Sequence, residues 1–552
     1  MRRILPLLVL AMAACHPAAA PRPALLPYQN LHLSFGVRAA DLVRRMTPAE
    51  RVAQMGNTAP AIPRLGVPAY NWWNEGLHGV ARNGIATVFP QAIGLAATWD
   101  TVEMHRVATV IGVEARAKYA AAQAAGQHGT YQGLTFWSPN INIFRDPRWG
   151  RGMETYGEDP WLTGRLAVAF IRGLQGDDPH YLRAIATPKH FAVHSGPEPD
   201  RHGFDATIGE RDLLQTYLPA FEAAIREGGA RSVMCAYNRL DGTPACANHR
   251  LLDTILRRNW GFTGYVVTDC DAIDDMVHGH HSDSTIVAAA AHAVAAGTDL
   301  NCGGSFRRLA QALSDSLVAE SVVDTAVTRL FTARMQLGLF DPASRVRYAR
   351  IPADSNDTPD HAALALRAAE KSMVLLKNDG TLPLDRRALH HVAVIGPDAD
   401  NIEVLLGNYN GTPSAPVTPL AGIRAALGPD IEVTYARGSA VARANTTDSA
   451  SADSAMRTEA VEAARHADVV LLFAGLSPRL EGEEMRVDAP GFKGGDRTSL
   501  DLPAPQEQLI EDVTATGKPV VLVLVNGSAL AVNWAAAHVN AIVEAWYPGQ
   551  AA

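Results

Sequence analysis

The chain has 552 residues and a formal net charge of −8 at pH 7. This length is more than one hydrophobic core normally serves, so it predicts two domains. The mild negative charge, with no basic block outside the N-terminus, argues against nucleic acid as a partner. After the N-terminal segment no apolar run approaches the roughly 20 residues that a membrane span needs.

Residues 1–20 predict an export signal. A basic start is followed by a short apolar run from Ile4 to Ala14, the pattern of a signal peptide. The residues that end at Cys15 also resemble a bacterial lipoprotein cleavage box, although Met stands where Leu is usual, so Cys15 is a candidate for lipidation. Plain cleavage near Ala18 to Ala20 is the alternative. We therefore expect an exported protein, either periplasmic or anchored to the outer membrane by lipid, with secretion as the other alternative.

Residues 28–340 predict a parallel β/α barrel of the TIM type. Apolar strand-like runs alternate there with Ala-rich helical segments, and the length is typical of such a barrel with insertions. The strand-like runs are Leu134–Ile143, Ala184–Phe191, Arg231–Tyr237 and Tyr265–Asp269. Ligands and catalytic groups collect where the strands of such a barrel end.

A linker and a helix, residues 341–388, lead into a second alternating block, residues 389–552. Strand-like runs such as Val469–Ala474 and Val520–Val525 predict an α/β sandwich domain with a parallel sheet. The sequence stops soon after an apolar run that ends at Trp546. Because a further helix should cover that strand, we expect this domain to be incomplete.

Polar and aromatic side chains stand at the ends of several predicted barrel strands, or in loops between them. Each has an ordinary alternative: a strand-end Asp caps helices, a Lys-His pair is usually solvated, and paired tryptophans often pack at interfaces. Together, however, they predict one polar pocket for a polyhydroxylated ligand. The set comprises Glu75, Arg151, Lys189, His190, Tyr237 and Asp269.

From about Asp41 to its last residue, the chain resembles glycoside hydrolase family 3. The matching motifs are Trp149–Arg151, Lys189–Phe191, Thr268-Asp269, Leu375–Asn378 and Trp546–Gly549. The resemblance implies retaining hydrolysis of β-glycosides, with Asp269 as the nucleophile and the other five residues of the set around the innermost sugar. It implies an oligosaccharide substrate, no cofactor and no metal.

Retention needs a second carboxyl, which must be protonated and lie about 5–5.5 Å from the first. In this family it usually comes from the second domain, where Glu481, Glu483 and Glu484 follow a predicted strand. We predict Glu481 as the acid/base because it is the first carboxylate after the strand, with Glu483 and Glu484 as alternatives. We also expect nearby Lys189 and Arg151 to keep Asp269 ionised, since opposite charges lower a carboxyl pKa.

The residues after Asp269 resemble the β-xylosidase branch of the family. Cys270 stands where many β-glucosidases have Trp, and Glu75 stands where other members have Asp. In that branch the counterparts of Cys270 and Cys302 form a disulfide beside the pocket. A disulfide and a longer carboxylate would crowd the space of a hydroxymethyl group, which favours a pentose. We therefore predict an exo-acting β-xylosidase that releases xylose from β-1,4-xylo-oligosaccharides.

The remaining cysteines and histidines carry less information. An exported protein permits disulfides, and four cysteines after Cys15 allow three pairings; with the resemblance, Cys235 and Cys246, which flank a turn, would form the second bridge. The cluster of histidines at His278–His281 could suggest a metal, but consecutive histidines in a loop are more often solvated. We predict no metal site.

Three alternatives stay open. Within the family they are a β-glucosidase and an α-L-arabinofuranosidase. From another class, the chain could be a non-catalytic sugar-binding protein, if an incomplete second domain fails to position Glu481. An N-acetyl-hexosaminidase is disfavoured, because that branch carries its acid in a Lys-His-Phe-Pro-Gly-His-Gly loop and this chain continues differently after Phe191.

Overall fold

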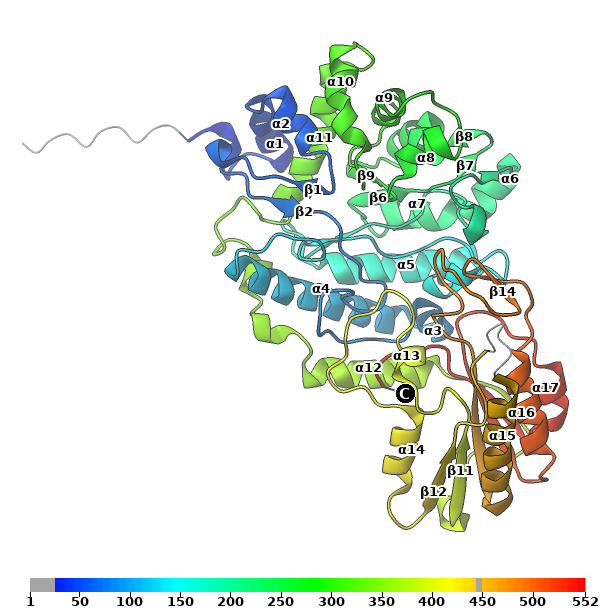
Figure 1. The fold of residues 1–552 in the computed structure, drawn as a ribbon. Coiled ribbons are helices and arrows are strands. Elements are labelled where there is room, and N and C mark those ends of the chain that lie inside the picture. The colour runs from blue at the N-terminus through cyan, green and yellow to red at the C-terminus, as the bar shows by residue number, and fades with distance from the viewer. Residues whose placement is uncertain (1–24, 443–448, 552) are drawn as a thin grey trace, which may run out of the picture.

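The computed structural model describes residues 25–442 and 449–551, so the predicted export signal and Cys15 lie outside the described residues. Figure 1 shows two bodies: the first, blue to green, contains the N-terminal part, and the second, yellow to red, lies beside its lower end. Within the described part of the chain, no helix is long and apolar enough to cross a membrane.

The first body is the predicted TIM-barrel-like domain, although its strands are shorter than the sequence predicts. Its parallel strands are β3 (Thr135–Phe136), β4 (Ile185–Ala186), β6 (Ser232–Cys235) and β9 (Tyr265–Thr268), which pair as β3 with β4 and β6 with β9. Single parallel bridges join these pairs to each other and to residues near 56, 74 and 300. A short antiparallel pair, β1 (Thr58–Ala59) and β2 (Tyr70–Asn71), precedes these strands in the chain.

Helices surround the barrel and bury its apolar strands. They are α1 (Phe35–Arg44), α2 (Pro48–Ala53), α3 (Ala92–Ala97), α4 (Thr101–Ala124), α5 (Pro160–Gln175), α6 (Glu210–Asp212), α7 (Pro219–Arg226), α8 (Ala272–His278), α9 (Ile286–Ala296), α10 (Leu309–Ser314) and α11 (Glu320–Gln336), with a π-helical segment at Arg250–Asn259. Every residue of β6 and β9 is buried. Because these strands are packed in the core, the backbone of the residue that follows each strand is held in place.

The second body is a six-stranded α/β sandwich in the order β10-β17-β16-β13-β11-β12. Its strands are β10 (Val374–Asn378), β11 (His391–Ile395), β12 (Glu432–Ala436), β13 (Val469–Gly475), β16 (Val520–Val525) and β17 (Ala541–Glu544). Its helices are α13 (Ile402–Leu405), α14 (Pro419–Leu427), α15 (Ser449–His466), α16 (Ala504–Thr514) and α17 (Asn533–His538). Separate hydrophobic clusters fill the two faces of the sheet.

The connection between the two bodies differs from the prediction. Helix α12 (Pro359–Ser372) ends before the predicted linker does, and β10 follows it as an edge strand antiparallel to β17. The sheet is therefore mixed, whereas the sequence predicted a parallel one. A short hairpin, β14 (Phe492–Lys493) and β15 (Asp496–Arg497), lies on a loop that reaches from the second body to the barrel.

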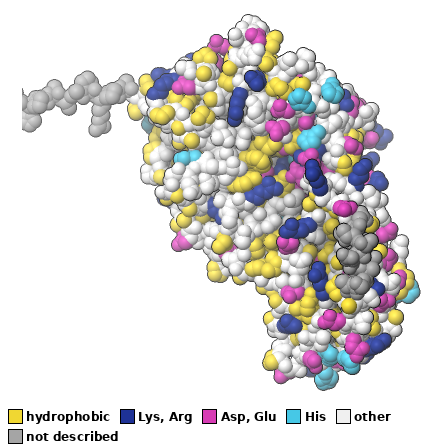
Figure 2. Space-filling view, viewed as in Figure 1, with side chains coloured by type: hydrophobic (Ala, Val, Ile, Leu, Met, Phe, Trp, Pro, Cys, Tyr) yellow, Lys and Arg dark blue, Asp and Glu magenta, His cyan; other side chains and the backbone are white. Residues whose placement is uncertain are grey.

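Acidic, basic and histidine side chains are intermixed on the face that Figure 2 shows, without one large area of a single sign.

Candidate active site

Asp269 directly follows the buried strand β9, and its two carboxylate oxygens have different surroundings. Oδ1 accepts the backbone N–H of Cys270 at 2.8 Å. Oδ2 is buried, has no hydrogen-bond partner among the described residues and lies 3.3 Å from Nε2 of His190. One oxygen is thus held in place while the other remains available to a reacting atom.

Asp269 faces a cavity of about 220 Å³ to which all six residues of the predicted set contribute. Eight further residues outside the predicted set line it: Trp73, Arg82, Trp137, Arg201, Met234, Cys270, Tyr409 and Glu483. Tyr409 and Glu483 belong to the second domain. The pocket is therefore built by both domains.

Glu75 is fixed at one wall of this pocket. Its Oε1 accepts Nε1–H of Trp73 at 2.9 Å, and its Oε2 pairs with Nζ of Lys189 at 3.3 Å. Trp73 in turn stacks on Trp137, with ring centres 5.4 Å apart. Of the two neighbouring tryptophans only Trp73 faces the pocket, because Trp72 packs into the core against Tyr265.

His190 is held in one tautomer by Asn142, which the sequence analysis missed. The Asn142 amide donates to the backbone carbonyl of His190 at 2.9 Å, and its Oδ1 accepts the backbone N–H of His190 at 2.9 Å. Oδ1 is thus an acceptor, so Nδ1 of His190, 2.8 Å away, carries the proton. Burial, followed by nearby Arg151, lowers the pKa of His190 well below its usual value. Its Nε2 is therefore an acceptor, and Nη2 of Arg151 lies 3.5 Å from it.

Glu483 is the second carboxylate in the pocket, and cations of the barrel hold it. Its Oε1 lies 3.1 Å from Nη1 of Arg151 and 2.7 Å from Nη1 of Arg201, while the hydroxyl of Tyr409 donates to Oε2. Burial raises the pKa of Glu483, but Arg151 and Arg201 outweigh burial and lower the pKa below its usual value. Arg201 follows no predicted barrel strand, which is why the sequence analysis did not include it.

Glu481, the predicted acid/base, does not line the pocket. Its side chain is fully buried in the second domain, where Oε1 accepts the N–H of Gly527 at 2.9 Å and the hydroxyl of Tyr547 at 2.7 Å, and Oε2 accepts the hydroxyl of Ser528. Burial raises the pKa of Glu481 despite these donors. Glu481, the first carboxylate after β13, thus anchors its loop. Glu483, two residues later, lines the pocket that Asp269 also lines.

The pKa of Asp269 shifts in the direction opposite to the one expected. Burial raises it, and the opposing effects of Arg201, Arg151 and Lys189 do not cancel that rise. The expectation of a lowered pKa counted the two nearby cations but not the removal of water, which disfavours the charged form.

Both expected disulfides are present, Cys235–Cys246 and Cys270–Cys302. Cys270 lines the pocket directly after Asp269, and Cys235 ends β6 two residues before Tyr237. Within the residues that the structure describes, no group of three or more His, Cys, Asp or Glu side chains is placed to hold a metal ion. In the histidine-rich loop, Nε2 of His280 lies 2.8 Å from the backbone carbonyl of Tyr237.

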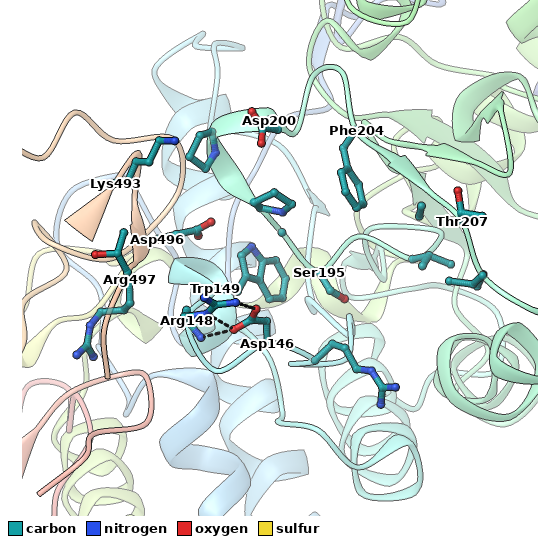
Figure 3. A pocket seen from close by; sticks show the side chains of 18 of the residues that line it. Asp146, Arg148, Trp149, Ser195, Asp200, Phe204, Thr207, Lys493, Asp496 and Arg497 are labelled. Atoms are coloured by element: carbon teal, nitrogen blue, oxygen red, sulfur yellow. Dashed lines mark hydrogen bonds and ion pairs between the residues drawn. The ribbon is translucent and has the colours of Figure 1, made fainter. Parts of the chain in front are cut away.

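A second cavity, of about 470 Å³, is lined by residues of both domains. Figure 3 shows the second domain's loop with Lys493, Asp496 and Arg497 on one side, Phe204 and Thr207 of the barrel on the other, and Arg148 and Trp149 between them. Two arginines close in sequence thus serve different cavities, since Arg151 lines the first pocket and Arg148 lines the second cavity.

Comparison with known proteins identifies relatives over most of the chain. The description "Glycosyl hydrolase family 3 N terminal domain" matches residues 37–333, and "Glycosyl hydrolase family 3 C-terminal domain" matches residues 373–552. A probable beta-D-xylosidase 7 of Arabidopsis thaliana is 42% identical over 98% of this chain and 70% of its own length. A xylan 1,4-beta-xylosidase of Xylanibacter ruminicola is 35% identical over 95% of this chain and 77% of its own length.

A solved structure of a family 3 exo-beta-xylosidase, in complex with a xylobiose aziridine activity-based probe, has the same fold. Its TM-score is 0.86 at 36% sequence identity, and the match covers 95% of this chain and 67% of the solved one.

Proposed function

Because this chain belongs to glycoside hydrolase family 3, we propose that it is an exo-acting β-xylosidase that releases xylose from the non-reducing end of β-1,4-xylo-oligosaccharides, with retention at the anomeric carbon. The observation that carries this proposal is one small pocket in which Asp269 of the barrel and Glu483 of the second domain both take part.

Asp269 fits the role of nucleophile. Asp269 lines the pocket, and its Oδ2 is buried without a hydrogen-bond partner among the described residues, so it can attack the anomeric carbon and form a glycosyl-enzyme intermediate. Oδ1 keeps the N–H of Cys270, which fixes the orientation of the carboxylate during the attack. Burial raises the free energy of the charged form, and bond formation to the sugar neutralises that charge.

We assign the acid/base role to Glu483 in place of the predicted Glu481. Glu483 would protonate the departing oxygen and then take a proton from the water that hydrolyses the intermediate. In the ligand-free pocket the arginines favour its ionised form. Sugar hydroxyls that accept hydrogen bonds from Arg151 and Arg201 would weaken this pairing and raise the pKa of Glu483. Substrate binding would thereby help to supply the proton.

The walls of the pocket support a pentose and release from the chain end. The cavity of about 220 Å³ is small, and the disulfide-bonded Cys270 forms part of its wall. Both oxygens of Glu75 are already held by Trp73 and Lys189, so this wall has little freedom to move aside for a hydroxymethyl group. A xylose unit lacks that group.

The test is hydrolysis of matched p-nitrophenyl β-xyloside, β-glucoside and α-arabinofuranoside, and of methyl β-xyloside as a substrate with a poor leaving group, by the wild type and by D269N, E483Q and E481Q. We expect a preference for the xyloside, loss of all turnover in D269N, and a loss of about 10²–10⁴-fold in E483Q on poor leaving groups. E481Q should keep its turnover but melt at a lower temperature. A preference for glucoside or arabinofuranoside would replace the proposed substrate with that alternative, and binding of xylobiose without turnover would replace hydrolysis with sugar binding.

We also propose that the protein is exported, either to the periplasm or onto the outer membrane through lipidated Cys15. The two disulfides support an oxidising compartment. Fractionation of cells that express the wild type or C15A tests this. A lipid anchor predicts that only the wild type sediments with membranes, and equal solubility of both would favour plain cleavage of the signal.

A further inference from the structure

Glu483 depends on contacts that cross from one domain to the other. It belongs to the second domain, whereas Arg151 and Arg201, which hold its carboxylate, belong to the barrel. Any displacement of the loop that carries Glu483 would therefore separate the carboxylate from its two partners.

The Glu483 loop lies directly on the hairpin β14–β15. The backbone N–H of Gly482 donates to the carbonyl of Gly495 at 3.1 Å, and that of Met485 donates to the carbonyl of Gly494 at 3.2 Å. Glu483 lies between these two donors. The position of the hairpin thus determines the position of the acid/base.

Asp496, on this hairpin, fastens it to the barrel. Its Oδ1 accepts the backbone N–H of Gly150 at 2.9 Å, and its Oδ2 accepts the backbone N–H of Glu198 at 2.9 Å. Figure 3 shows its side chain directed from the hairpin toward the barrel segment that carries Trp149. Hydrogen bonds to an ionised acceptor are among the stronger ones in proteins.

The two barrel segments that Asp496 joins are those that carry the partners of Glu483. Gly150 directly precedes Arg151, and the Glu198 side chain pairs with Nη1 of Arg201 at 3.2 Å. We propose that Asp496 is a positioning residue for catalysis: its single carboxylate holds the Glu483 loop in register with both arginines. This inference rests on the proposed hydrolysis and on Glu483 as its acid/base.

The first readout is kinetic and compares two leaving groups. We expect D496A to lose about 10- to 100-fold in kcat/KM on methyl β-xyloside, whose poor leaving group needs the acid, and much less on p-nitrophenyl β-xyloside. D496N, which keeps the shape but only one acceptor oxygen, covers the case in which D496A does not fold. K493A is the matched control, because Lys493 lies on the same hairpin and is exposed. Equal losses on both substrates, or none, would overturn the proposal.

The second readout does not depend on turnover. Hydrogen exchange of the amides of Gly150 and Glu198 should accelerate together in D496A, accelerate for at least one of the two in D496N, and stay unchanged in K493A. Unchanged exchange would overturn the docking role even if activity fell. A wild type that hydrolyses no xyloside would refute the proposed function, while the exchange experiment would still decide whether Asp496 docks the loop.

Discussion

At the scale of single residues, Arg201 affects the pKa values of both carboxylates of the pocket, Glu483 and Asp269. It lies 2.7 Å from Glu483 and stacks over the ring of Tyr237, with 4.3 Å between its guanidinium carbon and the ring centre. It lowers the pKa of Glu483 and also opposes the rise that burial causes in the pKa of Asp269. One cation thus favours the charged form of both groups.

Replacement of Arg201 should therefore move the whole pH profile. In R201Q the pKa values of Glu483 and Asp269 both rise, because each loses a nearby positive charge. Both limbs of the profile of kcat/KM against pH should shift to higher pH, by about one unit. The shift to higher pH is expected whether Asp269 or Glu483 controls the acidic limb of the profile, because both pKa values rise. R148Q is the control, since Arg148 pairs with Asp146 outside the pocket; limbs that stay in place or move to lower pH in R201Q would contradict the assignment.

The sequence predicted the pocket residues that follow strands or stand in short motifs. Asp269 and Tyr237 closely follow buried strands, so their place at the rim follows from the barrel. Asn142, Arg201 and Tyr409 could not be predicted in this way. Each lies in a loop, and its position depends on contacts with chain segments distant in sequence, such as the contact between Tyr409 and Glu483.

Glu481 and Glu483 show the same limit within one loop. The sequence placed an acid after β13 but could not determine which carboxylate faces the barrel, because that depends on the hydrogen bonds that Ser528 and Tyr547 make to Glu481. These donors come from distant parts of the second domain.

At the scale of elements, β17 carries a buried carboxyl that affects stability. Glu544 is buried, its Oε1 accepts the N–H of Trp546 at 3.0 Å, and burial raises its pKa from 4.5 to about 8. The folded protein therefore keeps this proton up to about pH 8, whereas the unfolded chain releases it above about pH 4.5. The stability that this group contributes is lost as pH rises through that window.

Substitution of Glu544 with Gln should remove this pH dependence. Because Gln cannot ionise, we expect E544Q to melt close to the wild type at pH 5 and above it at pH 8, by about 2–4 °C for each kcal/mol recovered. Thermal unfolding at the two pH values measures this. E432Q, on the exposed end of β12, is the control. If the melting temperatures of the wild type and E544Q changed by the same amount between pH 5 and pH 8, Glu544 would not be the source of the pH dependence of stability.

The two disulfides belong to the same scale, since each closes a loop around a strand end. Cys235–Cys246 spans 11 residues and Cys270–Cys302 spans 32. Chain entropy predicts losses of about 3 and about 4 kcal/mol respectively when each pair is replaced by Ala. Denaturant unfolding of the barrel should therefore show the larger loss for C270A/C302A. The reverse order would mean that lost packing beside the pocket, rather than chain entropy, determines the effect.

At the scale of the whole molecule, the junction of the domains assembles the site. The sequence predicted both domains and their order, because alternating apolar runs are local signals. It could not predict their junction, part of which consists of backbone contacts, such as those from Arg497 N–H to the carbonyl of Arg148 and from Arg82 N–H to the carbonyl of Asn410. Backbone groups are the same in every residue, so no pattern of side chains reveals them.

Gly150 is the position where this junction is tightest. A Cβ added there would lie 1.9 Å from the carbonyl oxygen of Gly495 and 2.7 Å from the amide nitrogen of Gly482. Both are backbone atoms of the loop that carries Glu483, so they cannot give way by a side-chain rotation. A single methyl group would therefore push the second domain's loop away from the barrel.

We expect G150A to lose acid catalysis while both hydrophobic cores stay intact. The kcat/KM on poor leaving groups should fall by about 10²-fold or more, because Glu483 leaves the reach of Arg151 and Arg201. The kcat/KM on an activated aryl xyloside, which needs attack by Asp269 but little help from the acid, should fall much less, because the barrel wall of the pocket does not move. G209A provides the control, because a Cβ there meets open space. Wild-type rates in G150A on the poor leaving group would mean that the acid does not depend on this junction, and Glu483 would lose its assignment.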